Sequence, residues 1–162
     1  MARFFEKISF EQFSKDISDD KSLYESYNLP KRSTKSSAGY DFEAISDFTL
    51  VPGEIKKIPL GIKACMNEGE VLFLIVRSSQ GFKYNVRMCN QVGIIDSDYY
   101  HNPDNEGHIF IALQNEGDKE LVVKAGNAFA QGIFTKFLLT DDDNVTTSRV
   151  SGIGSTNKKE GN

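Results

Sequence analysis

Short apolar runs separated by turn-forming residues dominate the chain from about residue 38 onward. The runs are divided by pairs such as Pro52-Gly53 and Gly126-Asn127. Short strands at this spacing, with no helical period between them, are typical of an antiparallel sandwich or barrel. We therefore predict an all-β domain whose strands include residues 48–51, 55–59, 71–76, 109–113, 121–123 and 129–139.

The first 25 or so residues have a helical pattern instead. Ser9 and Gln12 have the spacing of a capping box, and Ile8 and Phe13 stand at the positions of a hydrophobic staple. One helical face then carries apolar side chains, which is typical of core or interface packing rather than of ligand binding. The residues on this face are Phe10, Phe13 and Ile17.

Composition divides the chain into three parts. We predict a helical extension over residues 1–28 and a β domain over residues 29–143. The remaining segment, residues 144–162, is rich in Gly, Ser, Thr, Asn and Lys. It is too polar to pack alone, so we expect a flexible C-terminal arm.

Composition and charge exclude several classes of function. The 162 residues include 19 Lys+Arg and 23 Asp+Glu, a formal net charge of −4, which argues against broad electrostatic binding of nucleic acid. The longest apolar run, residues 71–76, is far shorter than the ~20 residues that a membrane helix needs. Charged residues precede any apolar stretch at the N-terminus, so no secretory signal is predicted. We expect an intracellular, cytoplasmic protein, or a nuclear one in a eukaryote.

Scarce residue types exclude more. Two cysteines, Cys65 and Cys89, are too few for a disulfide framework or a four-thiolate zinc site. The two histidines, His101 and His108, form no zinc motif with their neighbours. The chain also lacks the Gly-x-x-x-x-Gly-Lys-Ser/Thr motif of a P-loop.

Five islands place small, polar or charged residues where a β domain would otherwise have ordinary strand ends. In order and separation they resemble the five motifs of the trimeric dUTP diphosphatase (dUTPase) family. That resemblance implies a jelly-roll β fold and a homotrimer whose active sites are shared between subunits. It also implies Mg²⁺-assisted hydrolysis of dUTP to dUMP and pyrophosphate, which keeps uracil out of DNA and supplies dUMP for thymidylate synthesis. The islands are residues 38–42, 77–81, 90–99, 126–131 and 149–156.

The third island carries most of the implied chemistry. From the residues alone, the turn that begins at Asp96 favours a hairpin, and a carboxylate there is more often a solvated turn residue than a catalyst. The resemblance implies instead that Asp96 is the general base that deprotonates the attacking water. It implies that Tyr99 packs under deoxyribose, and that the base edge is read by Asn90 and by the hairpin backbone around Gly93 and Ile95.

The phosphate chain is assigned to the other islands. The resemblance gives it Arg77, Ser78 and Ser79, with Gln131 contacting phosphate or the catalytic water. Asp41 resembles the carboxylate that organises the phosphate and metal region, and Mg²⁺ is expected to bind through substrate phosphates and water, with no direct protein ligand. In the C-terminal arm the expected ligands of the nucleotide are Arg149, Ile153, Gly154 and Ser155.

Departures from the family pattern keep two alternatives open. Ile153 replaces the usual stacking Phe, residues 127–128 lack two charges, and residues 100–107 are an insertion. A dCTP deaminase shares the fold, but Ala112 stands where that enzyme has its catalytic Glu. The second alternative is a dUTPase-like regulatory protein without catalysis.

Overall fold

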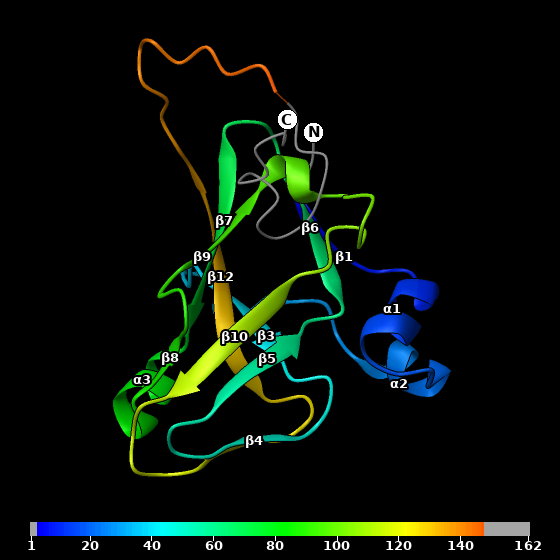
Figure 1. Ribbon diagram of the computed structural model, residues 1–162, viewed down its shortest axis with the longest axis vertical. Helices are drawn as coiled ribbons and strands as arrows, with labels where there is room; N and C mark the ends of the chain where they lie inside the picture. Colours follow the sequence, from blue (N-terminus) through cyan, green and yellow to red (C-terminus); the bar gives the residue numbers. More distant parts are fainter. Residues whose placement is uncertain (1–2, 148–162) are drawn as a thin grey trace, which may run out of the picture.

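The computed structural model describes residues 3–147, and most of its regular elements are strands (Figure 1). This confirms the predicted all-β class. The strands are β1 (Phe4–Lys7), β2 (Lys31–Arg32), β3 (Tyr40–Glu43), β4 (Phe48–Leu50), β5 (Ile55–Pro59), β6 (Ile62–Cys65), β7 (Glu70–Val76), β8 (Val86–Met88), β9 (Gly93–Asp96), β10 (Phe110–Asn115), β11 (Leu121–Val123) and β12 (Ala128–Lys136). The helices are α1 (Phe10–Asp16), α2 (Lys21–Ser26), α3 (Ser78–Tyr84) and the 3₁₀ turn η1 (Ser97–Tyr99).

The strands pair antiparallel in one large and three small sheets. The large sheet has the order β2-β3-β12-β7-β9, and a second sheet has the order β5-β10-β8. Two further pairs are β1-β6 and β11-β4. Neighbours in these sheets are rarely neighbours in the chain, so the strands cross repeatedly from one sheet to another.

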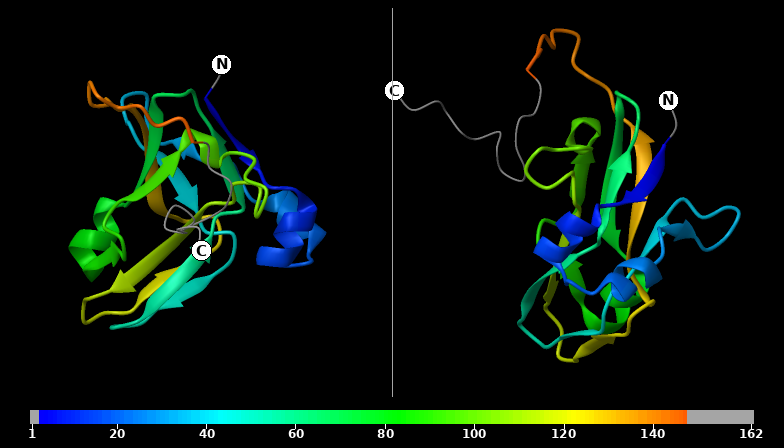
Figure 2. Two further views of the ribbon diagram at one scale, coloured as in Figure 1. Left: turned by 45° about the horizontal axis from the view of Figure 1, so that its top comes forward. Right: turned by 90° about the vertical axis from the view of Figure 1, so that its right-hand side faces the viewer.

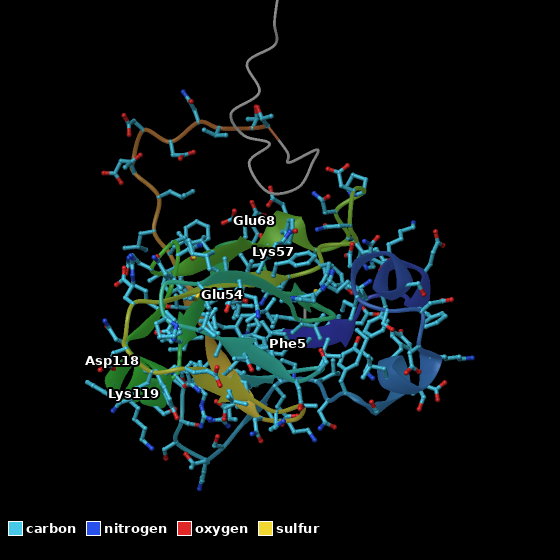
Figure 3. The ribbon with its side chains drawn as sticks, turned by 60° about the horizontal axis from the view of Figure 1, so that its bottom comes forward. Phe5, Glu54, Lys57, Glu68, Asp118 and Lys119 are labelled. Atoms are coloured by element: carbon cyan, nitrogen blue, oxygen red, sulfur yellow. The ribbon has the colours of Figure 1, made fainter. Side chains whose placement is uncertain are left out.

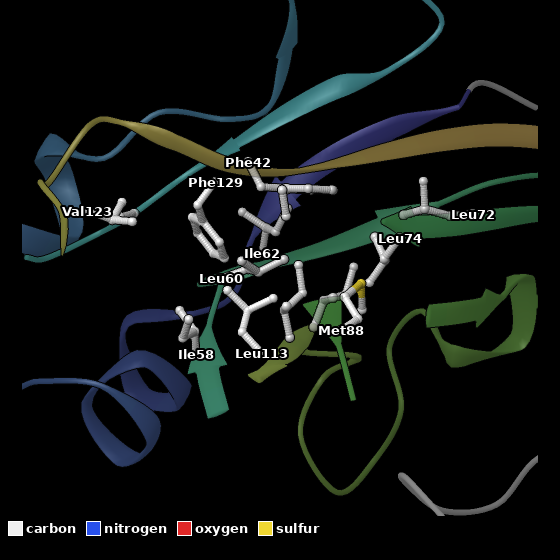
Figure 4. Close-up of a cluster of buried hydrophobic side chains, with 14 of the residues drawn as sticks. Phe42, Ile58, Leu60, Ile62, Leu72, Leu74, Met88, Leu113, Val123 and Phe129 are labelled. Atoms are coloured by element: carbon white, nitrogen blue, oxygen red, sulfur yellow. The ribbon is translucent and has the colours of Figure 1, made fainter. Parts of the chain in front are cut away.

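The core fills the space between the sheets (Figure 4). Alternate residues of β10 point inward, which is the period that a half-buried strand requires. Burying each large side chain contributes about 1.5–3 kcal/mol. Labelled members of this cluster are Phe42, Ile58, Leu60, Ile62, Leu72, Leu74, Met88, Leu113, Val123 and Phe129. Charged side chains such as Asp118 and Lys119 lie at the periphery, and Phe5 lies inside (Figure 3).

The predicted strands are present, with β12 ending at Lys136 rather than at residue 139. Strands β1, β2, β3, β6 and β8 and helix α3 were not predicted. β6 is difficult to predict because Lys63 interrupts its apolar pattern, yet this lysine is only 5% exposed. α3 is difficult to predict because it contains Gly81, which lowers helix propensity.

The N-terminal segment begins with a strand and continues as two helices. Ser9 caps α1 by accepting a hydrogen bond from the Gln12 backbone N–H at 3.1 Å, and Ile8 and Phe13 are both fully buried. These contacts confirm the predicted cap and staple. The second helix, α2, has Asp20 as its N-cap, whose carboxylate accepts a hydrogen bond from the Leu23 backbone N–H at 3.1 Å. Both helices lie on one flank of the strands, opposite α3 (Figures 1 and 2).

A buried histidine fastens this helical flank to the β domain. His108 Nδ1 lies 2.5 Å from Asp16 Oδ2, and the Gly61 N–H donates to Nε2 at 2.9 Å. Because Nε2 accepts a hydrogen bond, the imidazole is neutral and its proton is on Nδ1. Burial lowers the pKa of His108, and the hydrogen bond and charge of Asp16 oppose this only in part.

Acid should weaken this attachment. The unfolded chain protonates His108 near pH 6.5, whereas the folded chain resists protonation. The full contribution to the free energy of unfolding is therefore present above pH 6.5 and falls as the pH drops below it. We expect His108→Gln to be about 1–3 kcal/mol less stable than the wild type at pH 7.5. When the pH falls from 7.5 to 5.5, the free energy of unfolding of the variant should decrease less than that of the wild type. Urea unfolding at fixed protein concentration measures both quantities.

His101→Gln is the matched control, because His101 is an exposed histidine of the same loop. This variant should keep the wild-type dependence of stability on pH. If the stability of His108→Gln depended on pH as the wild-type stability does, His108 would not be the titrating group.

Candidate active site

Three of the predicted site residues meet where β7 ends. β12 lies between β3 and β7, and its Gln131 is paired with Asp41 on one side and with Ile75 on the other. Arg77 Nε lies 3.1 Å from Asp41 Oδ1, and Gln131 Nε2 donates to the Val76 carbonyl at 3.4 Å. A carboxylate from β3, an amide from β12 and a guanidinium from the residue that follows β7 thus come together.

Gly39 makes room for this cluster. A Cβ atom on Gly39 would lie 2.2 Å from Gln131 Oε1, which is less than any ordinary contact. The absence of a side chain at residue 39 therefore allows the Gln131 amide to sit against the β3 strand. Gly39 was not singled out as a site residue from the sequence, although it stands inside the first motif.

The same corner continues into a cavity of about 320 Å³ at the start of α3. Arg77 is the N-cap of this helix and donates from Nη1 to the Ala128 carbonyl at 3.3 Å. Ser79 lines the cavity and donates to Gln80 Oε1 at 2.8 Å, while Ser78 is exposed. Lys83 lies one turn after Ser79 and lines the same cavity, which gives this end of the molecule a second cation.

The sequence did not indicate Lys83 because its proximity depends on α3. Ser33 was missed in the same way, since its hydroxyl donates to Asp41 Oδ2 from a segment without any motif. Together, Ser33 and Arg77 contact both oxygens of the Asp41 carboxylate. Asp41 is therefore better placed to orient Arg77 than to bind a metal ion directly.

The predicted base-reading and catalytic residues lie along β9 and its flanking turns. Gly93 and Ile95 are within β9, opposite Leu74 and Leu72, and Asn90 is exposed in the turn before it. Asp96 ends β9 and is half-buried. It lines a cavity of about 620 Å³ together with two other acidic residues, Glu68 and Asp98.

Tyr99, three residues after Asp96, is buried rather than open to solvent. Only 5% of the residue is exposed. Its hydroxyl donates to the His108 carbonyl at 3.1 Å and accepts from Asn105 Nδ2 at 2.8 Å. The loop of residues 100–107 therefore folds back over this tyrosine.

The hairpin expected at Asp96 is not formed. β9 pairs with β7, whereas the next strand, β10, pairs with β5 and β8. The 3₁₀ turn and the loop after it carry the chain from one sheet to the other. The turn chemistry was identified correctly, but a turn does not determine whether the following strand returns to the same sheet.

One chain does not bring the two groups of site residues together. Asp96 is paired with Val71, and Arg77 follows the last residue of the same strand, Val76. Six residues of strand separate Asp96 from Arg77, a distance of roughly 20 Å at about 3.3 Å per residue. η1, which follows Asp96, and α3, which follows Arg77, accordingly lie at opposite ends of the molecule (Figure 1).

Other predicted features are only partly covered by the structure. Arg149, Ile153, Gly154 and Ser155 lie outside the described residues. Within residues 3–147, no group of three or more His, Cys, Asp or Glu side chains could hold a metal ion. No helix in that range is long and apolar enough to cross a membrane.

Substituting Gly39 should disturb Gln131 directly. We expect Gly39→Ala to displace the Gln131 side chain and to cost about 1–3 kcal/mol of stability through overpacking. The NMR signals of the Gln131 side-chain amide report the displacement. Gly81→Ala is the control, because a Cβ on Gly81 meets nothing within 4 Å. Unchanged Gln131 signals in Gly39→Ala would refute the close packing.

Known proteins have similar sequences and the same fold. The dUTPase family model matches residues 25–161. A deoxyuridine 5′-triphosphate nucleotidohydrolase of Lactococcus lactis is 50% identical over 131 residues, which cover 80% of this chain and 87% of that protein. One from Desulfitobacterium hafniense is 37% identical over 136 residues, covering 79% of this chain and 86% of that protein.

Solved structures agree with these sequence matches. The crystal structure of a dUTPase from Streptococcus mutans has a TM-score of 0.66 at 42% identity, and the match covers 85% of this chain and 98% of that one. A dUTPase from phage phi11 of S. aureus, solved with a structural Mg(II) ion, has a TM-score of 0.65 at 18% identity over 91% of this chain and 98% of that one, which shows the shared fold alone. The predicted dUTPase-like fold is thus confirmed, and the chain belongs to the dUTPase family.

Proposed function

We propose that this protein is a dUTP diphosphatase, which hydrolyses dUTP to dUMP and pyrophosphate. Family membership and 50% identity to a deoxyuridine 5′-triphosphate nucleotidohydrolase support the activity. The observation that carries the proposal is the Arg77–Asp41–Gln131 cluster, which presents an oriented guanidinium and an amide at a strand end. The activity would remove dUTP that could enter DNA and would supply dUMP, and it implies an intracellular, cytoplasmic location.

The Arg77 corner is proposed to bind the phosphate chain. A guanidinium offers planar, bidentate recognition of phosphate oxygens. The contact between Arg77 Nε and Asp41 Oδ1, at 3.1 Å, fixes the orientation of the Arg77 guanidinium. Ser78, Ser79 and Gln131 add short donors around it. Such donors would stabilise the oxygen bridging the α- and β-phosphates, which gains charge as its bond to the α-phosphorus breaks.

Asp96 is proposed to be the general base. Its carboxylate would accept a proton from a water molecule whose oxygen attacks the α-phosphorus, while pyrophosphate leaves on the opposite side. The backbone around Gly93 and Ile95, together with Asn90, is proposed to read the uracil edge. Tyr99, fixed by its two hydrogen bonds, would close the space that a 2′-hydroxyl needs.

Mg²⁺ is proposed to bind mainly to the substrate. When bound to the phosphate oxygens, it would neutralise charge on the leaving group. The residues suit this outer arrangement, because both oxygens of Asp41 already contact protein donors. Asp41 would then act on the metal region through Arg77 and water.

The distance between Asp96 and Arg77 supports a site shared between subunits of a homotrimer. A phosphate chain cannot reach from one group to the other within one chain, given the roughly 20 Å of strand between them. The two cavities are also complementary in charge, with Arg77 and Lys83 in one and three carboxylates in the other. Arg149, Ile153, Gly154 and Ser155 are proposed to close over this shared site.

A substrate panel tests the activity. We expect release of pyrophosphate from dUTP and little from dCTP, dTTP or UTP. Asp96→Asn should lower kcat by about 10²–10⁴-fold, the usual contribution of a general base. Ammonia release from dCTP would favour a deaminase instead, and no turnover of any nucleotide would favour a regulatory protein.

Mixing inactive variants tests the shared site. Asp96→Asn and Arg77→Ala should each be inactive alone. If Asp96 and Arg77 of one site come from different subunits, equal random mixing should restore about one quarter of the sites, since each of the two subunits has an even chance of being intact at its position. Refolding the two variants together and assaying dUTP hydrolysis measures this fraction.

The control mixes Asp96→Asn with the double variant that carries both substitutions. Every subunit in this mixture carries Asp96→Asn, so no site can combine an intact Asp96 with an intact Arg77. Activity should therefore stay at the background level. An equally inactive mixture of the two single variants would place both residues in one chain's own site.

A further inference from the structure

Two segments are not used by the proposed chemistry, yet they contact one another extensively. One is the N-terminal segment, residues 3–28, most of which precedes the family match that begins at residue 25. The other is the insertion loop, residues 100–107, which follows η1 directly and is followed by His108. The interface between them lies beside β6, with which β1 is paired.

Glu106 is the centre of the contact. Its carboxylate accepts from the Ser9 backbone N–H at 3.0 Å and from the Ser9 hydroxyl, at the start of α1. Lys63 Nζ lies 3.3 Å from Glu106 Oε2 and 3.8 Å from Glu6 Oε2. Only 7% of the Lys63 side chain is exposed, so its charge depends on these carboxylates.

Burial alone would raise the pKa of Glu106. The hydrogen bonds from Ser9 and the charge of Lys63 instead lower this pKa, so that the carboxylate stays ionised. Removing it would leave the buried Lys63 ammonium with weaker partners, Glu6 at 3.8 Å and the Tyr100 ring at 5.6 Å. Glu106 therefore joins α1, β6 and the loop at a single side chain.

The neighbouring loop residues make further contacts to the same segment. The Tyr100 hydroxyl donates to Glu6 Oε2 at 2.5 Å, and its ring lies edge-on to Phe4 with centroids 6.0 Å apart. At the other end of the loop, His108 contacts Asp16 of α1. The loop is thus attached to the N-terminal segment at Tyr100, its first residue, at Glu106 near its end, and at His108 directly after it.

On its buried side, the loop contacts Tyr99, the last residue of the turn η1 that follows the proposed base Asp96. Asn105 and the His108 carbonyl both contact the Tyr99 hydroxyl, and the Asn102 backbone N–H donates to the Tyr99 carbonyl at 3.1 Å. Gly107 has φ +84°, and a Cβ there would lie 2.4 Å from the Tyr99 carbonyl oxygen. Tyr99 is the last residue of η1, three residues after Asp96, which is the N-cap of that turn.

We propose that the N-terminal segment positions Asp96 and Tyr99 through the insertion loop, with Glu106 as the positioning residue. The inference rests on the proposed function. A loop without regular structure samples many conformations unless contacts restrict it. Because a misplacement of about 1 Å can cost about 100-fold in rate, anchoring this loop determines how well the carboxylate and the sugar pocket are aligned.

Glu106→Gln tests the role while preserving side-chain size. It removes the charge that Lys63 requires and one of the two acceptors used by Ser9. We expect kcat for dUTP to fall about tenfold, a smaller loss than a full ångström of misplacement causes. The preference for dUTP over UTP should fall as well, because Tyr99 shifts. Inhibition by inorganic tripolyphosphate should be unchanged, since the Arg77 corner lies at the other end of β7.

Glu116→Gln is the matched control, because Glu116 is also a loop glutamate in an ion pair, with Arg87 Nη2 at 2.5 Å. It should leave kcat, substrate preference and inhibition at wild-type values. Tyr100→Phe, which removes one hydroxyl from the same anchor, should change kcat in the direction of Glu106→Gln by a smaller factor. A merely structural loss would reduce the active fraction equally for all nucleotides and leave the dUTP/UTP ratio intact.

Hydrogen exchange separates failure of this inference from failure of the proposed function. Amides of residues 97–108 should exchange faster in Glu106→Gln than in the wild type, whether or not dUTP is hydrolysed. Wild-type turnover together with unchanged exchange, kcat and substrate ratio in Glu106→Gln would overturn the positioning role alone. A wild type without turnover would overturn the proposed function, and unchanged exchange would then overturn the anchoring of the turn as well.

Discussion

The pairing of β12 with β7 is the constraint on which the remaining structure depends. Seven consecutive residue pairs run from Ala130 opposite Val76 to Lys136 opposite Glu70. This register places Gln131 beside the end of β7, where Arg77 begins, and β3 on the other side of β12 adds Asp41. It also determines where β9 can attach, because β9 pairs with the opposite half of β7. A shift by one residue would turn every side chain of β12 to the other face.

Because Arg77 follows one end of β7 and Asp96 is paired with the other end, the fold separates the groups that the chemistry must unite. The end with Arg77 and Lys83 is cationic, and the end with Asp96, Asp98 and Glu68 is acidic. In a protein with a net charge of −4, such separation keeps an anionic ligand attracted to one end only. The proposed trimer resolves the separation by joining unlike ends of different subunits.

Much of the fold could be predicted from local patterns, because those patterns act over a few residues. The cap at Ser9 and the strand that became β5 were identified from spacing and alternation alone. β6 was missed because the partners that make a buried Lys63 acceptable, Glu6 and Glu106, are far away in the chain. The hairpin at Asp96 was wrong for a related reason, since the sheet that receives β10 is decided by long-range pairing.

For the candidate site, the sequence indicated candidate residues but not how they are arranged. The five islands indicated Asp41, Arg77 and Gln131, and the structure brings these three together. No local signal could show that Asp96 lies most of the length of β7 away from Arg77, because that separation depends on the register between β9 and β7. The supporting residues Ser33, Gly39 and Lys83 were likewise invisible without the three-dimensional neighbours that they contact.

Gly107 has an evolutionary consequence. Its φ of +84° and the carbonyl oxygen that would lie 2.4 Å from any Cβ leave this position closed to every other residue type without rearrangement. The tip of the loop at Pro103 and Asp104 is exposed, so it can drift in length and character. Changes at the tip can therefore add surface features, whereas a substitution of Gly107 would force the backbone of Tyr99, and with it the end of η1, to move.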